Sequence, residues 1–246
     1  MRIHVVGGIL AASAILASCR DAQTEGEVET KTATGEVATS ISGDSADKRG
    51  VALVRVVNAA PTNAALIVRA DPQHALTEAG FKEVTNYQPI DRNWVTFEVG
   101  TSTDNVFEPL ATNREMLTDG HRYTIVVMRD SGSKGYETRV LRDEISDDKT
   151  QAFIRVVHAA RGVGEVNIVQ RGADTLFDGV NFTMEGGYRA VTPWTGTLEI
   201  RTEDGNRLVH SIPNMALTAG HSYTIVLTRG AGGRVESIRF DDSPVN

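Results

Sequence analysis

Histidine, cysteine, serine and acidic side chains are the groups that could do chemistry in this chain of 246 residues. There are six histidines, at positions 4, 74, 121, 158, 210 and 221. None forms a His-x-His or His-x-x-x-His pair, so no local metal site is encoded. His158 has Asn58 exactly 100 residues earlier, and an amide is a poor zinc ligand, which favours a structural hydrogen-bonding role at this position.

Motifs for nucleophilic catalysis or phosphate binding are absent from the sequence. There is no Gly-x-Ser-x-Gly, no Gly-x-x-x-x-Gly-Lys and no Gly-x-Gly-x-x-Gly. The acidic run Asp143 to Asp148 does not have the spacing of an EF-hand loop, and we interpret it as a solvated linker, with weak calcium binding as the alternative. The formal net charge of −7 and the lack of a Lys/Arg run argue against nucleic-acid binding. We therefore expect a non-catalytic protein without a cofactor or a metal.

The single cysteine, Cys19, follows a short apolar segment. Val5 to Ser18 would span only about 21 Å as a helix, less than a bilayer core of about 30 Å, so it indicates a removable signal peptide. The sequence Leu16-Ala17-Ser18-Cys19 resembles the bacterial lipoprotein box. That resemblance implies cleavage before Cys19 and acylation of Cys19, for example with palmitate. A plain secretory signal is the alternative.

The resemblance also implies a place in the cell envelope. Arg20 stands after the cysteine instead of the Asp that resembles an inner-membrane retention signal, so we expect a lipid anchor in an outer membrane. Residues 20–50 are rich in Thr, Ser, Glu, Gly and Ala and contain no aromatic residue, which predicts a disordered tether.

The remainder of the chain is an internal repeat with an offset of 100 residues. Leu-Thr-Asp-Gly-His-Arg-Tyr-Thr-Ile-Val at 117–126 recurs as Leu-Thr-Ala-Gly-His-Ser-Tyr-Thr-Ile-Val at 217–226. The two tryptophans, Trp94 and Trp194, have the same offset. We expect them in core or half-buried positions, with a ligand platform as the alternative. The repeat predicts two modules, and the chain divides into a signal peptide at 1–18, a lipidated tether at 19–50, and domains at 51–147 and 151–243.

Each module consists of short runs rich in Val, Ile and Thr, separated by Gly, Pro, Asn and Asp. Seven or eight such runs per hundred residues predict an all-β protein with two tandem immunoglobulin-like, Greek-key β-sandwiches. Helical periodicity is missing, and Ala75 to Phe81 holds one helical turn at most.

The long repeated stretch resembles the tyrosine corner of such sandwiches. The resemblance implies that Leu117 and Leu217 plug the core, that Gly120 and Gly220 permit the turn, and that Tyr123 and Tyr223 bond back to upstream backbone at the start of the penultimate strand.

The module also resembles a bacterial family known as "domain of unknown function 4397". The resemblance rests on Arg-Val-Val-Asn-Ala-Ala-Pro at 55–61, on Arg-Val-Val-His-Ala-Ala at 155–160, and on the later Gly-x-x-Tyr-Thr strand. It implies fold and export but no activity. Our leading hypothesis is an envelope-anchored binding or adhesion module that faces the periplasm or the exterior. A structural spacer is the alternative, and a hydrolase assembled from distant loops is the third hypothesis.

Overall fold

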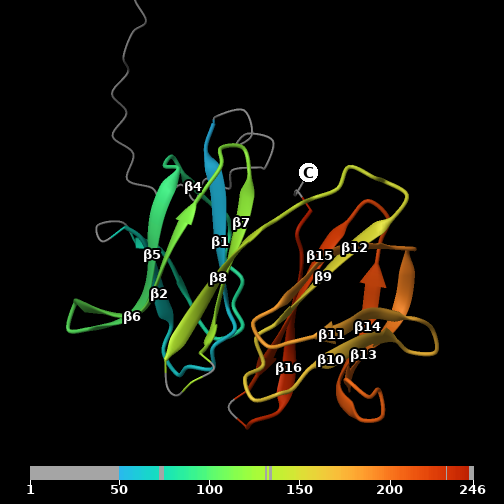
Figure 1. Cartoon of the computed structure of the whole chain (residues 1–246). Coiled ribbons are helices and arrows are strands. Elements are labelled where there is room, and N and C mark those ends of the chain that lie inside the picture. Colours follow the sequence, from blue (N-terminus) through green and yellow to red (C-terminus); the bar gives the residue numbers. More distant parts are fainter. Residues whose placement is uncertain (1–49, 72–74, 131, 133–134, 231, 244–246) are drawn as a thin grey trace, which may run out of the picture. The chain divides into compact units, whose positions relative to one another are not determined.

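The computed structural model describes residues 50–71, 75–130, 132, 135–230 and 232–243. The signal peptide, Cys19, residues 20–49 of the tether and His74 lie outside these residues. The described chain is all-β, with sixteen strands in four four-stranded sheets, and it confirms the predicted pair of β-sandwiches (Figure 1). Within this part of the chain we find no helix with the length and apolar character needed to cross a membrane.

The first sandwich has one sheet in the order β4-β1-β7-β8 and a second in the order β3-β2-β5-β6. Its strands are β1 (Ala52–Asn58), β2 (Leu66–Ala70), β3 (Ala75–Ala79), β4 (Gln88–Ile90), β5 (Trp94–Thr103), β6 (Val106–Met116), β7 (Arg122–Arg129) and β8 (Tyr136–Arg142). The first strand runs parallel to β7, with Val56 opposite Ile125, and all other pairs are antiparallel. The sequence pattern does not predict this parallel pair.

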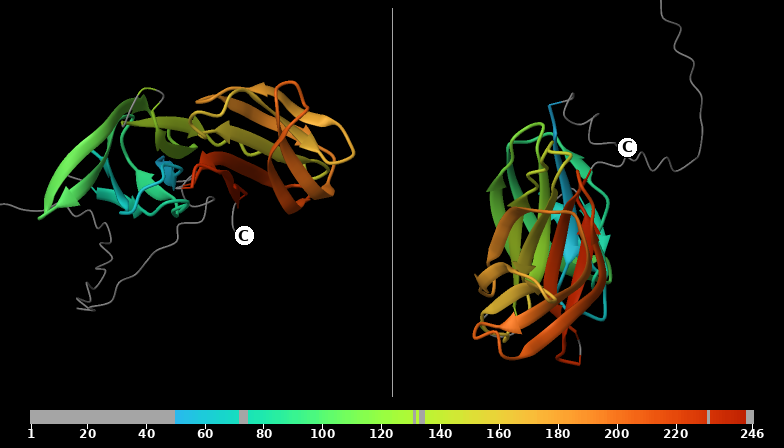
Figure 2. Two further views of the ribbon diagram at one scale, coloured as in Figure 1. Left: turned by 90° about the horizontal axis from the view of Figure 1, so that it is seen from below. Right: turned by 90° about the vertical axis from the view of Figure 1, so that its right-hand side faces the viewer.

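The second sandwich repeats this arrangement with the sheets β12-β9-β15-β16 and β11-β10-β13-β14. Figure 2 shows this sandwich, coloured yellow to red, from two further directions. Its strands are β9 (Ala152–His158), β10 (Val166–Gln170), β11 (Thr175–Val180), β12 (Glu185–Val191), β13 (Trp194–Thr202), β14 (Leu208–Leu217), β15 (Ser222–Arg229) and β16 (Val235–Asp241). Again the first strand, β9, runs parallel to the penultimate strand, β15.

Two local details were not predicted. Residues 75–79, where one helical turn was the most that the pattern allowed, form strand β3, because β3 pairs with β2 and buries Ala79. Residues 181–184 form a turn between β11 and β12, in which Thr183 adopts a φ of 67°.

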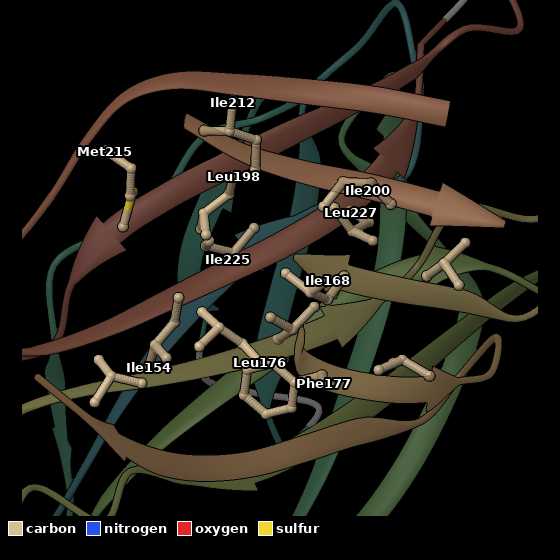
Figure 3. Packing of buried hydrophobic residues seen from close by; sticks show 14 of the residues in the cluster. Ile154, Ile168, Leu176, Phe177, Leu198, Ile200, Ile212, Met215, Ile225 and Leu227 are labelled. Carbon is tan, nitrogen blue, oxygen red and sulfur yellow. The ribbon is translucent and has the colours of Figure 1, made fainter. Parts of the chain in front are cut away.

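Each sandwich has a hydrophobic core of its own. In the first, alternate residues of β1, Val54 and Val56 among them, meet Phe97 of β5 and Ile125 of β7. In the second, side chains from both sheets converge between the layers; among them are Ile154, Ile168, Leu198, Ile200 and Ile225 (Figure 3). Burying an aliphatic side chain of this size contributes about 1.5–3 kcal/mol, so each module has enough apolar burial to fold around its own centre.

The inner strands β1, β7, β9 and β15 are buried on both faces. All seven residues of β1 are buried, and so are seven of the eight residues of β7. A third hydrophobic cluster accounts for this, because it joins Val57, Val126 and Met128 of the first module to Val157 and Val226 of the second. The two modules therefore share a packed junction.

Candidate binding groove and module junction

The repeated Leu-x-x-Gly-x-x-Tyr stretch forms the same corner in both modules. Leu117 and Leu217 are buried in the two cores. Gly120 and Gly220 have φ values of 75° and 78°, a conformation that costs glycine little. The hydroxyl of Tyr123 accepts a hydrogen bond from the amide of Thr118 at 2.9 Å, and the hydroxyl of Tyr223 accepts one from Thr218 at 3.3 Å. These residues stabilise the fold, and none of them lines the two arginine-rich hollows of the second sandwich.

Asn58 and His158 perform the same structural task in the two modules. The amide of Ala60 donates to Oδ1 of Asn58 at 2.9 Å, and the amide of Ala160 donates to Nδ1 of His158 at 3.2 Å. Nε2 of His158 lies 3.1 Å from the carbonyl oxygen of Gly164. Because Nδ1 accepts a hydrogen bond from the amide of Ala160, the neutral ring carries its proton on Nε2. Nε2 therefore donates a hydrogen bond to the carbonyl oxygen of Gly164. His158 thus holds the loop between β9 and β10.

The other three histidines that the structure describes also have hydrogen-bonding partners. Nδ1 of His121 lies 3.1 Å from the carbonyl oxygen of Asp119, and Nδ1 of His221 lies 2.6 Å from Oδ2 of Asp241. His210 lies 3.2 Å from the hydroxyl of Ser237. In the part of the chain that the structure describes, no group of three potential ligands is placed to hold a metal ion.

The two tryptophans differ in their surroundings. Trp194 is half-buried against the second core, and its ring lies close to Gly196. Trp94 is 57% exposed, so the expectation of a core or half-buried position is wrong for it, and the guanidinium of Arg114 lies 5.0 Å from its ring centroid. The cation over its ring takes up part of the surface that a ligand platform would need.

The junction contains a reciprocal exchange of charges between the modules. Arg55 of β1 pairs with Asp242, which follows the last strand of the second module. Arg155 of β9 donates from Nη2 to Oδ1 of Asp143, which follows the last strand of the first module, at 2.6 Å. All four side chains are almost completely buried. Each arginine therefore neutralises the carboxylate of the other module.

Threonine and tyrosine hydroxyls complete both halves of this network. Oγ1 of Thr124 accepts a hydrogen bond from Nε of Arg55 and donates to Asp143, and Thr224 accepts from Arg155 and donates to Asp242. The hydroxyl of Tyr87 donates to Asp143 at 2.7 Å, and that of Tyr188 donates to Asp242 at 2.8 Å. Every carboxylate in the junction thus accepts several hydrogen bonds.

Burial governs the protonation of these groups. It raises the pKa of Asp242, although Arg55 and Arg155 act in the opposite direction. Burial and the neighbouring carboxylates raise the pKa of both Tyr87 and Tyr188 above the ordinary value, so both phenols remain protonated donors. For Arg55, burial opposes the charge, but Tyr87, Asp143 and Asp242 hold its pKa above the ordinary value.

The interpretation of Asp143 as part of a solvated linker is therefore wrong. Its carboxylate is buried and engaged by Arg155, Thr124 and Tyr87. Removing one partner of a buried ion pair costs about 3–5 kcal/mol, because the other charge stays behind in a low-dielectric site. The junction is thus specific as well as apolar, and it fixes the two sandwiches to each other.

A polar groove opens at the loops that join the strands of the second sandwich. Its volume is about 600 Å³, and its walls come from the β9–β10 loop, the β13–β14 turn and the β15–β16 turn. Three arginines line it, Arg207, Arg229 and Arg234, together with His210 and Glu165. Burial lowers the pKa of His210, so this ring is neutral at pH 7.

A second hollow of about 470 Å³ adjoins the groove and shares Gly162, Arg229 and Gly233 with it. Arg129 of the first module and Arg161 also line this hollow. We call the two hollows together the arginine groove. Of the residues that the structure describes, five arginines and one glutamate line it, in a chain whose formal net charge is −7.

Arg129 and Arg229 recur in the repeat because each closes a loop. Arg129 donates to the carbonyl oxygen of Pro61 at 3.2 Å, and Arg229 donates to that of Arg161 at the same distance. Nε of Arg229 also donates to the carbonyl oxygen of Gly233 at 2.7 Å. The loop after the first strand is thereby tied to the penultimate strand in each module.

Part of the chain matches a known family model. A family model described as "Domain of unknown function (DUF4397)" matches residues 52–169. The match begins with β1 and ends inside β10, so it continues past the first sandwich into the second. No curated protein matches the chain.

Two solved structures are similar to the chain at 11% sequence identity. One is a candidate cell adhesion protein from Bacteroides uniformis ATCC 8492, with a TM-score of 0.26, and the other is a candidate cell adhesion protein from Bacteroides fragilis NCTC 9343, with a TM-score of 0.21. Each match covers 79% of this chain and 99% of the solved chain.

Neither the junction nor the arginine groove was predicted from the sequence. A signal for the junction was present, because runs such as Val-Ala-Leu-Val-Arg-Val-Val at 51–57 lack the alternation of a strand with one solvated face. An arginine inside such a run needs a buried partner. The groove had no comparable signal, because Arg161, Arg207 and Arg234 come together only through three separate loops.

Proposed function

We propose that this protein is a lipid-anchored envelope protein whose two sandwiches act together as one non-catalytic binding module. The observation that carries the proposal is the arginine groove. Its walls bring together three loops of the second sandwich and Arg129 of the first. Ligand sites are commonly concave and several hundred cubic ångströms in volume, and convergent polar groups fix the orientation of the ligand in them.

The internal repeat indicates that the polar side chains of this groove have a role other than folding, which favours ligand binding. Positions that serve the shared fold keep their residues, as Arg129 and Arg229 do. By contrast, Arg161, Arg207 and His210 have Pro61, Phe107 and Leu110 at the positions 100 residues earlier. The module does not need those three polar side chains in order to fold, because its first copy lacks them.

A rigid spacer is the second candidate function, and the buried junction favours it. A pair of sandwiches joined by buried ion pairs resists bending between its modules, and this is the property that a spacer requires. The two functions differ in whether the arginine groove contacts another molecule in the cell.

Photo-crosslinking in cells separates these functions. A photoreactive residue in place of Arg207 lies in the groove, and one in place of Thr112, an exposed residue of β6, provides a control outside it. We expect a discrete adduct with an envelope component from position 207 and none from position 112. Equal or absent adducts at the two positions would contradict a binding function and leave the spacer.

The anchor and the second domain copy belong to the same proposal. We propose cleavage before Cys19, acylation of Cys19, a place in the outer membrane, and a second copy of the DUF4397-like module at 151–243. Labelled fatty acid should enter the wild-type protein and be absent from a Cys19→Ser variant. Label that persists in the variant would overturn the anchor.

A further inference from the structure

We infer that the arginine groove binds an acidic oligosaccharide and recognises its carboxylate, sulfate or phosphate groups. This inference rests on the proposed binding function and adds the chemistry of the ligand. Three features carry it: the local charge, the fixed geometry of one guanidinium, and the form of the groove.

The local charge is opposite to that of the chain as a whole. Among the described residues that line the groove, Glu165 is the one acidic side chain, and its carboxylate accepts a hydrogen bond from Asn181 at 2.7 Å. Positive charge therefore prevails in this lining. A guanidinium presents planar pairs of N–H donors that fit the two oxygens of a carboxylate, sulfate or phosphate.

Arg229 is held in place at the centre of the groove. Its Nε and Nη1 donate to the carbonyl oxygens of Gly233 and Arg161, which fixes the plane of the guanidinium. Gly162 and Gly233 flank it with φ values of 72° and 74°, and a β-carbon on Gly162 would approach Nη1 of Arg229 to 2.9 Å. Because glycine has no side chain, neither Gly162 nor Gly233 covers this guanidinium. A donor that is already fixed loses little conformational entropy when it binds a ligand.

The form of the groove favours an extended ligand with repeated charges. Its arginines come from separate loops and line two adjoining hollows, so a single small anion would engage only part of them. Half-buried His210, neutral at pH 7, adds an imidazole ring, a group that hydrogen-bonds sugar hydroxyls. Among the described residues that line the groove there is no aromatic side chain, and single-stranded nucleic acids depend on such rings for base stacking.

The test uses the purified full-length protein and calorimetric titration with four probes. They are an oligogalacturonate, a heparin-derived oligosaccharide, inorganic phosphate, and a neutral malto-oligosaccharide of similar length. We expect the two acidic oligosaccharides to bind, with an affinity that falls as salt increases. Phosphate alone should bind at least tenfold more weakly, and the neutral oligosaccharide should not bind.

A pair of charge-matched variants locates the site. Arg207→Glu with Arg234→Glu reverses two exposed groove charges, and Arg139→Glu with Lys149→Glu makes the same change in net charge at exposed positions outside the groove. We expect the groove variant to lose at least tenfold in affinity for the acidic oligosaccharides and the control variant to lose less than threefold. Equal thermal unfolding of the two variants shows that the difference does not come from misfolding.

The outcomes distinguish this inference from the proposed function. Absence of binding by both acidic oligosaccharides, or equal losses in the two variants, would overturn the inference. Tighter binding of phosphate or of the neutral sugar would also overturn it. If crosslinking from position 207 still captured an envelope component, the binding function would survive with a ligand of different chemistry.

Discussion

Asn58 and His158 occupy equivalent positions in the two modules, and this equivalence predicts how substitutions of His158 change the stability of the protein. His158 is completely buried, accepts a hydrogen bond from Ala160 and donates one to Gly164. A His158→Ala variant loses two hydrogen bonds of about 1 kcal/mol each and leaves a buried N–H without a partner, so we expect a loss of about 2–4 kcal/mol. A His158→Asn variant keeps the bond from Ala160, as Asn58 does in the first module, and should lose only about 1 kcal/mol.

The same histidine makes stability depend on pH. Burial lowers the pKa of His158, so the folded state binds a proton less readily than the unfolded state, whose histidine pKa is about 6.5. The free energy of unfolding therefore has its full value above about pH 6.5 and falls as the pH drops towards the folded pKa, by at most about 1.4 kcal/mol per pH unit. This component should be absent from His158→Asn. His210, whose pKa burial also lowers, contributes equally to both proteins and cancels in the comparison.

Urea unfolding at several pH values between 5 and 8 measures both effects. Asn58→Ala is the matched variant in the first module, where the same kind of cap is removed without a titrating group. The reasoning would be refuted if His158→Asn were as unstable as His158→Ala. It would also be refuted if the difference in unfolding free energy between wild type and His158→Asn did not change with pH.

Three further predictions concern the junction, the groove and the corners. Asp143→Asn should cost about 3–5 kcal/mol in urea unfolding because it leaves Arg155 buried with a weakened partner, whereas Glu137→Gln, which breaks the exposed pair with Arg139, should cost about 1 kcal/mol or less. Arg229→Ala should release the β9–β10 loop, and hydrogen exchange at residues 161–164 should speed up while the core strands remain protected. Tyr123→Phe should lower the unfolding free energy by about 1 kcal/mol, and Tyr223→Phe by less, because its hydrogen bond is longer.

Much of the fold could be predicted from the sequence because the signals are local. Short runs of Val, Ile and Thr between turn residues specify strands, and the recurrence of residues 117–126 at 217–226 specifies two modules. The parallel pairing of β1 with β7 was not predictable in this way. It depends on contacts between segments about 70 residues apart, and period-2 patterns do not encode which strand lies beside which.

The candidate site was much less predictable than the fold. Asp143 looked like part of a solvated acidic run, but it is buried by Tyr87 and Thr124 of its own module and by Arg155, which reaches it from the first strand of the other module. The groove likewise depends on three loops that are far apart in the sequence and that the fold of the second sandwich brings together. Chemistry that is assembled from distant positions leaves little trace in local spacing.

The central claim is that the two sandwiches behave as one unit, and scanning calorimetry tests it most directly. For about 190 folded residues the calorimetric enthalpy of unfolding should be about 130 kcal/mol near 60 °C. If the junction unites the modules, the van't Hoff enthalpy should equal that value, because both modules unfold together. Two transitions, or one transition whose van't Hoff enthalpy is half of the calorimetric value, would show that the modules unfold independently and would contradict the account.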